Sequence, residues 1–238
     1  MQAFLAILRY DLGQLARSWL VRIWIVLLAA PALFLVVVAA NEGELASETL
    51  AAYTAAIYAP FSAIAVAVLA VGAVSGESGV SADSILSRSV TRTEYIAAKV
   101  VARLGVTLGV YAVIMIPFAY LVMRYAISDA SVGGVVVGLL MVASELAFLA
   151  AVGITLSTFM RNVLFAVLVL VVGILVSGVA LQFVGLTWMS TTAVINDLPE
   201  TFRGETPVRD EVRVLIVFAS LSGLAIISSI WHFRYKDL

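Results

Sequence analysis

Residues 20–40 read LVRIWIVLLAAPALFLVVVAA, and this stretch decides the class of protein to which the chain belongs. Arg22 is its only charged residue. A helix of about 20 residues is about 30 Å long, which matches the hydrocarbon thickness of a bilayer. Arg22 stands near one end, where its side chain can reach the interface, and Pro31 predicts a kink. We therefore expect residues 20–40 to form a transmembrane helix.

The rest of the chain has the same character. Of its 238 residues 63% are hydrophobic and 12% are charged, whereas soluble domains are about 45–50% apolar and about 25% charged. Runs bounded by charged residues predict further spans. The sequence therefore predicts one all-α integral membrane domain, residues 1–238, with six transmembrane helices at about residues 20–40, 53–75, 104–123, 132–159, 163–185 and 214–231.

The basic residues predict the orientation of the six spans, since loops rich in Lys and Arg stay in the cytoplasm. Ten of the 14 basic residues fall on the N-terminal side of the membrane. We therefore expect both termini in the cytoplasm of a multi-pass protein of the plasma (inner) membrane. The other four are Arg124, Arg203, Arg209 and Arg213.

Residues 1–19 precede the first span and have a helical pattern of their own. Phe4, Leu8, Leu12 and Leu15 are spaced to share one helical face. This pattern predicts an amphipathic helix that lies in the cytoplasmic interface. The alternative is a disordered segment or a plain extension of the first span.

Several kinds of chemistry are excluded by composition. The chain has no Cys, and His232 is its only His, so disulfides, thiol catalysis and histidine-based metal sites or triads are not expected. The net charge of −1 gives no indication of nucleic-acid binding. No Gly-x-x-x-x-Gly-Lys-Ser/Thr phosphate loop occurs. We expect no cofactor in this chain and no enzyme activity of the chain by itself.

The largest cytoplasmic loop, residues 76–103, contains a helix-start signal. Thr91 precedes Glu94 by three residues, just before an apolar run, which is the capping-box pattern. We expect a helix to begin near Arg92 and to continue into the third span. Such a loop can pass a push from a cytoplasmic partner into the membrane, or it can be a solvated connector whose charges only fix the topology.

Three segments of the chain carry a family resemblance. The first contains Gly76-Glu77 and then Ser89-Val-Thr-Arg92, Tyr95 and Lys99; the others are residues 153–162, GITLSTFMRN, and residues 233–238, FRYKDL. In their order, and in the basic N-terminal helix and six spans, they resemble permease subunits of the ABC-2 type, the membrane half of one class of ATP-binding-cassette transporters.

The resemblance implies a function and two protein partners. A separate ABC ATPase subunit would bind ATP and Mg²⁺, and a second permease subunit, identical or related, would complete a dimeric exporter in the bilayer. The cytoplasmic loop would dock on the ATPase as the coupling segment. Its candidate residues are Gly76, Glu77, Ile85, Leu86, Arg88, Thr91, Arg92, Glu94, Tyr95 and Lys99.

Within the spans, Glu145 and one small-residue pattern are candidates for function. Glu145 is an acid at mid-membrane depth, where a carboxylate is costly unless it is paired, protonated or facing water. It lines a translocation path or is hydrogen-bonded to a neighbouring helix. Gly173, Ser177 and Gly178 favour close helix packing, either between subunits or within one.

Two alternatives to an ABC permease remain open on the sequence. One is an ion-coupled secondary transporter that uses Glu145, and the other is a non-transporting scaffold for an ATPase-driven assembly system. The external segment, residues 186–213, also has two interpretations, because its uncharged first half either re-enters the outer leaflet or folds as an ordinary loop.

Overall fold

The computed structural model describes residues 2–73, 91–160 and 162–235. Six helical segments in these ranges are long and apolar enough to cross a bilayer, which confirms the predicted number of spans. They are α2 (Trp19–Glu42), the continuous run of α3 (Ala46–Tyr53), η1 (Thr54–Tyr58) and α4 (Ala59–Val71), then α6 (Arg92–Tyr125), α7 (Val132–Phe159), α8 (Val163–Phe183) and α10 (Val208–Tyr235).

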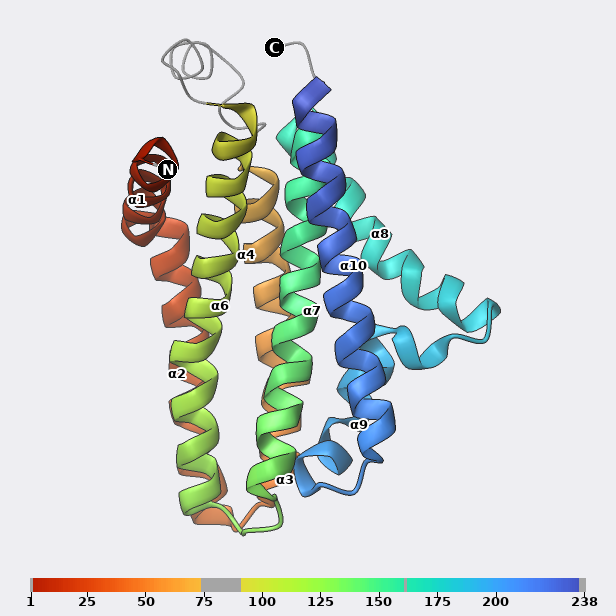
Figure 1. The fold of residues 1–238 in the computed structure, drawn as a ribbon. Coiled ribbons are helices and arrows are strands. Elements are labelled where there is room, and N and C mark those ends of the chain that lie inside the picture. The colour runs from red at the N-terminus through yellow and green to blue at the C-terminus, as the bar shows by residue number, and fades with distance from the viewer. Residues whose placement is uncertain (1, 74–90, 161, 236–238) are drawn as a thin grey trace.

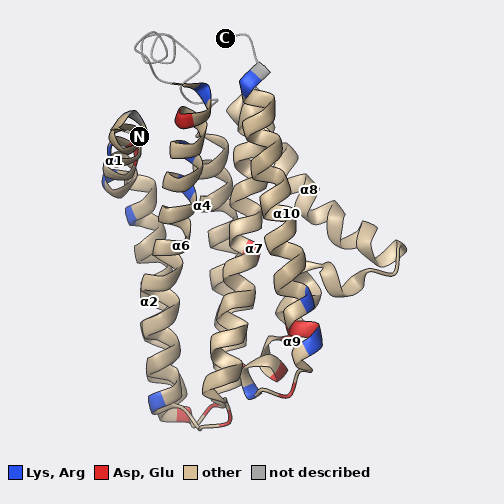
Figure 2. Cartoon of the chain, in the orientation of Figure 1, with Lys and Arg blue, Asp and Glu red and all other residues tan. Residues whose placement is uncertain are grey.

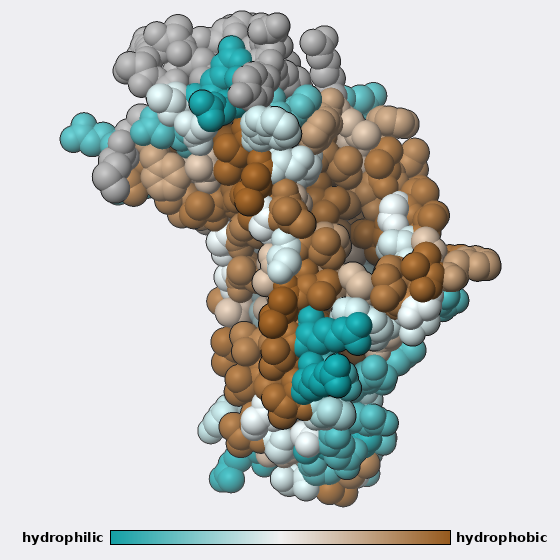
Figure 3. Space-filling view, turned by 45° about the vertical axis from the view of Figure 1, so that its right-hand side comes forward, coloured by the Kyte–Doolittle hydropathy of each residue, from teal (hydrophilic) through white to brown (hydrophobic). Residues whose placement is uncertain are grey.

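Most of the spans stand side by side, and α8 leans away from them (Figure 1). Charged residues gather at the two ends of the bundle and are sparse between them (Figure 2). The surface between the ends is largely hydrophobic (Figure 3). Large apolar side chains such as Phe34 and Leu164 are exposed there, as expected where lipid replaces water. The chain is therefore a multi-pass membrane protein.

The second span begins earlier than the sequence predicts and contains an irregular turn. Its helix starts at Ala46 instead of residue 53, and Glu48 lies in its first turn, where the helix dipole favours an acid. The π turn Thr54–Tyr58 follows at once. Tyr53, which precedes this turn, is fully buried, and its hydroxyl donates a hydrogen bond to Leu28 O at 2.9 Å. The irregular turn is therefore packed into the core.

The N-terminal segment forms a helix, α1 (Gln2–Arg17), beside the starts of α2 and α6. In Figure 1 it is seen almost end-on, so it runs across the bundle instead of along it. Leu8 and Leu15 pack against the core, whereas Leu12, expected on the same face, is exposed. Asp11 takes the inward position in its place, because positions 4, 8, 11 and 15 follow the helical repeat as closely as 4, 8, 12 and 15.

The segment between α8 and α10 folds into a short helix that packs on α7. Gly185 turns the chain at φ 76°, and η3 (Thr187–Met189) leads into α9 (Thr191–Arg203). A Cβ at Gly134 would lie 2.2 Å from Thr201 O, and one at Gly138 would lie 2.5 Å from the Phe202 ring. The absence of side chains at these two glycines lets α9 lie directly on the end of α7.

Candidate functional site

The start of α6 has the geometry that the sequence predicts. Thr91 Oγ1 accepts a hydrogen bond from the Glu94 backbone N–H at 3.2 Å, and the Thr91 N–H donates to Glu94 Oε2 at 3.4 Å. This reciprocal pair is a capping box, which satisfies two donors at the helix start. The helix then continues without a break to Tyr125. A movement of the chain at Thr91 would therefore be transmitted into the transmembrane region by one continuous helix.

The first turn of α6 is fastened to the end of α10. The buried ring of Tyr95 stacks on the buried ring of Phe233, with ring centroids 5.8 Å apart and planes at 19°. Arg92 Nη1 also donates to Arg234 O at 3.5 Å. Tyr95 therefore contributes to packing within the chain, whereas Arg92 and Glu94 are partly exposed.

The end of α7 meets the same part of α10. Phe159 stacks on His232 with ring centroids 3.9 Å apart and planes at 18°. Phe159 belongs to segment 153–162, Tyr95 to segment 89–99, and Phe233 to segment 233–238. Parts of all three segments that carry the resemblance are thus brought together at one end of the bundle, although they are far apart in the sequence.

A buried ion pair that the sequence interpretation missed joins α1 to α6. Lys99 Nζ lies 3.0 Å from Asp11 Oδ1, and each side chain is 2% exposed. The ammonium group also lies 5.4 Å from the centroid of the Tyr95 ring. Removing one member of such a pair leaves an uncompensated charge in the interior. Asp11 and Lys99 therefore hold α1 against the start of α6, whose first residues belong to the predicted coupling loop.

A sequence signal for this pair was present in the first helix. Asp11 is the only acid before Glu42, and it lies at a helical spacing from Phe4, Leu8 and Leu15. An acid on an apolar helical face indicates a buried partner. Lys99 could not be identified as that partner from the sequence, since the two residues are 88 positions apart.

Part of the predicted coupling segment cannot be placed. Gly76, Glu77, Ile85, Leu86 and Arg88 lie outside the described residues. The other candidates are described and stand within the first turns of α6 or directly before it, namely Thr91, Arg92, Glu94, Tyr95 and Lys99.

Glu145 lies in the middle of α7 and is partly exposed. Its Oε1 atom is enclosed and has no hydrogen-bond partner among the described residues. The described residues therefore do not provide this oxygen with a hydrogen-bond donor.

The small residues of α8 do not pack against any part of the chain that the structure describes. A Cβ at Gly173 or Gly178 would meet nothing within 4 Å. Ser177 is exposed and donates its hydroxyl hydrogen bond to Ile174 O in the same helix, at 2.7 Å. Only Ala166 and Leu170 are buried in this helix. Packing inside one subunit therefore does not explain the predicted small-residue pattern.

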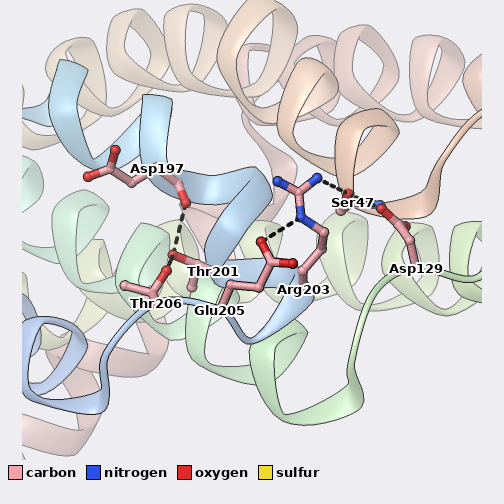
Figure 4. Close-up of polar contacts among 7 residues, drawn as sticks. All are labelled: Ser47, Asp129, Asp197, Thr201, Arg203, Glu205 and Thr206. Atoms are coloured by element: carbon pink, nitrogen blue, oxygen red, sulfur yellow. Dashed lines mark hydrogen bonds and ion pairs between the residues drawn. The ribbon is translucent and has the colours of Figure 1, made fainter.

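At the opposite end of the bundle, a polar network joins side chains from three segments of the chain (Figure 4). The Ser47 hydroxyl and backbone N–H both donate to the carboxylate of Asp129, the latter at 2.9 Å. Arg203 Nη1 donates to Ser47 Oγ at 3.5 Å, and Arg203 Nε pairs with Glu205 at 3.0 Å. These contacts fix α3, the connection before α7 and the end of α9 to one another.

Comparison with known proteins gives no family for the chain, because no family model matches it and no curated protein matches it. The assignment of function therefore depends on the residues and geometry described above.

Proposed function

We propose that this chain is the membrane-spanning permease subunit of an ABC transporter of the ABC-2 type, working as an exporter. One observation carries the proposal: Tyr95 and Phe233, from two of the segments that resemble the family, stack on each other, and Phe159, from the third, stacks on His232 directly beside Phe233. A separate ATPase subunit would dock at this end and hydrolyse ATP with Mg²⁺. The chain itself would form the translocation path.

The proposed orientation places this end in the cytoplasm of the plasma (inner) membrane. The start of α6 and the end of α10 lie at the same end of the bundle as α1 (Figure 1). Lys and Arg are concentrated there, while most acids lie at the opposite end (Figure 2). The positive-inside rule then favours cytoplasmic termini, and α1 would lie at the cytoplasmic membrane surface.

A second permease subunit would pack on α8. The exposed apolar surface of α8 and the open space at Gly173 and Gly178 support this role, because small residues let two membrane helices approach closely. Glu145 would face the translocation path, where a substrate group or water can satisfy its unpaired oxygen.

The proposal is tested by co-expressing the tagged chain with a candidate ABC ATPase subunit and purifying the complex in detergent. We expect the two proteins in about equal numbers, with ATP hydrolysis that depends on the complex. Arg92→Glu should weaken the association while the chain still inserts. Arg124→Glu is the matched control, since Arg124 lies on the same helix at its other end. Normal association and hydrolysis of Arg92→Glu would remove Arg92 from the docking surface.

A failure of every ATPase to associate would instead favour an ion-coupled secondary transporter. The unpaired Oε1 of Glu145 is the observation behind this second candidate. In proteoliposomes, Glu145→Gln would then abolish proton-coupled uptake while the protein stays folded. If Glu145→Gln behaves as wild type and only Glu145→Leu misfolds, the carboxyl group has a structural role. A complex with an ATPase but without transport would indicate the scaffold alternative.

A further inference from the structure

The outward face of α1 carries only positive charge. Its single acid, Asp11, is turned inward and neutralised by Lys99 at 3.0 Å. Arg9, Arg17 and the nearby Arg22 are exposed, and their guanidinium groups form no ion pair or hydrogen bond with any residue that the structure describes. In Figure 2 the basic colour marks the outer side of α1 and the start of α2. Three guanidinium groups are therefore available for an external anion.

Two of these arginines flank a hollow in the helix surface. Arg9, Gly13 and Arg17 follow one another at intervals of four residues, so they form a stripe along one side of the helix. The two arginines begin about 12 Å apart along the axis, and their long side chains can converge above Gly13. The hollow is open to the outside and is lined by exposed residues of α1, namely Arg9, Tyr10, Leu12, Gly13, Gln14 and Arg17.

Packing among the residues that the structure describes does not explain Gly13. A Cβ at this position would meet nothing within 4 Å, although glycine inside a helix costs about 1 kcal/mol relative to alanine. The missing side chain instead deepens the space between the two guanidinium groups. The described residues of its lining offer donors from Arg, Tyr and Gln and no carboxylate, which suits an anionic ligand.

The surroundings of the hollow are those of a membrane surface. Tyr10 is 68% exposed and Trp19, at the start of α2, is 73% exposed. Exposed Tyr and Trp beside the end of a span are typical of the lipid headgroup region. Leu5 and Leu12 add exposed apolar side chains on the same helix. An anion at this position is therefore expected to be part of a lipid.

We propose that α1 contains a binding site for the headgroup of an anionic phospholipid, with the phosphate held between Arg9 and Arg17 above Gly13. Arginine matches phosphate with paired, charge-assisted hydrogen bonds. The Asp11–Lys99 pair positions the site, because it removes the only acid from this face and fixes α1 on α6. The site goes beyond the proposed function and does not depend on an ATPase or on transport.

The site is tested by native mass spectrometry of the purified full chain in detergent, titrated with phosphatidylglycerol and with phosphatidylcholine of the same acyl chains. We expect the wild type to prefer phosphatidylglycerol. The variant Arg9→Gln/Arg17→Gln should lose about fivefold in this preference for each arginine, or about 25-fold in all. The control Arg124→Gln/Arg209→Gln removes two exposed arginines elsewhere and should keep the preference.

A second pair of variants separates charge from folding. Gly13→Glu places a carboxylate between the arginines and should abolish the preference, whereas Gly13→Gln has the same size and should retain most of it. Equal helix content by circular dichroism shows that both variants fold. Equal preference in wild type and in Arg9→Gln/Arg17→Gln, or inorganic phosphate competing at the affinity of the lipid, would overturn the proposal.

Discussion

At the scale of single residues, two kinds of position in the bundle tolerate little change. One is a glycine that is in contact with the backbone of another helix, and the other is a charged side chain that is buried away from water. Gly134 and the Asp11–Lys99 pair represent them at opposite ends of the molecule. Lys99 belongs to a segment that carries the family resemblance, but its pairing with Asp11 is not part of that motif. Their importance follows only from what lies within 4 Å of them in the folded chain.

Gly134→Ala should destabilise the packing of α9 on α7. The new Cβ would lie 2.2 Å from Thr201 O and 2.8 Å from Gly204 N, and these backbone atoms cannot move without shifting α9. We expect a loss of about 1–3 kcal/mol in stability, as for other overpacked positions. Thermal unfolding in detergent measures it. Gly133→Ala is the control, since a Cβ there meets nothing within 4 Å, and equal melting temperatures would contradict the packing.

Asp11→Asn should cost about 3–5 kcal/mol, because it leaves the Lys99 ammonium group buried without its counter-charge. Replacing both residues, as Asp11→Leu/Lys99→Met, should recover most of the stability, since no charge then remains in the interior. Chemical unfolding measures the differences. For comparison, Glu205→Gln breaks the exposed pair with Arg203 and should cost less than about 1 kcal/mol. A double variant no more stable than Asp11→Asn would disprove the charge argument.

At the scale of elements, α8 differs from the other spans. This helix buries only Ala166 and Leu170, so contacts with its own chain add little to its stability. It leans away from the bundle (Figure 1), which leaves most of its surface to lipid or to another protein. The remaining spans are held by polar or aromatic contacts at one or both ends. The subunit contact proposed above would give α8 the packing that it lacks.

Gly173→Ile should weaken self-association of the chain. A branched side chain at this position would keep two α8 helices apart, and it should leave the fold of the single subunit unchanged because nothing lies within 4 Å of a Cβ there. Single-molecule photobleaching in nanodiscs counts the subunits. Gly109→Ile is the matched control, since Gly109 has equally open space on α6. A dimer that resists Gly173→Ile would place the subunit contact elsewhere.

At the scale of the whole molecule, the sequence was sufficient to predict the number of transmembrane spans, since this depends only on the thickness of the bilayer. The length of an apolar run follows from membrane thickness, so six spans could be counted from the positions of the charges. The capping box also predicted the start of α6, because Thr91 and Glu94 act within one turn. These features are local, and no tertiary contact is needed to recognise them.

Features that depend on contacts between distant segments could not be predicted. The ion pair of Asp11 with Lys99 and the network of Ser47, Asp129 and Arg203 each join residues more than 70 positions apart. The helix α10 begins at Val208, six residues before the predicted span, because Asp210 and Glu211 suit the first turn of a helix that extends beyond the apolar run. Charge marks the edge of a membrane more reliably than the end of a helix.

The topology has a direct test, since the sequence contains no cysteine. Gln2 is the first residue of α1 and Glu42 is the last residue of α2, and both are exposed. Single cysteines at these two positions should react with a membrane-impermeant maleimide from opposite sides of the membrane. With cytoplasmic termini, Glu42→Cys is labelled in intact cells and Gln2→Cys only after permeabilisation. The unmodified chain serves as the unlabelled control. Labelling of both positions from one side would disprove the arrangement.

The π turn in the second span has a consequence for how this chain can vary in evolution. A π turn holds one residue more than the α turn it replaces. The second span therefore contains one residue more than a regular α-helix would need between its two halves, Ala46–Tyr53 and Ala59–Val71. Deleting one residue within Thr54–Tyr58 would convert the turn to ordinary helix and leave the facing sides of both halves nearly in place. A deletion elsewhere in the span would rotate one half by about 100°. Homologues one residue shorter are therefore expected to carry their gap at this turn.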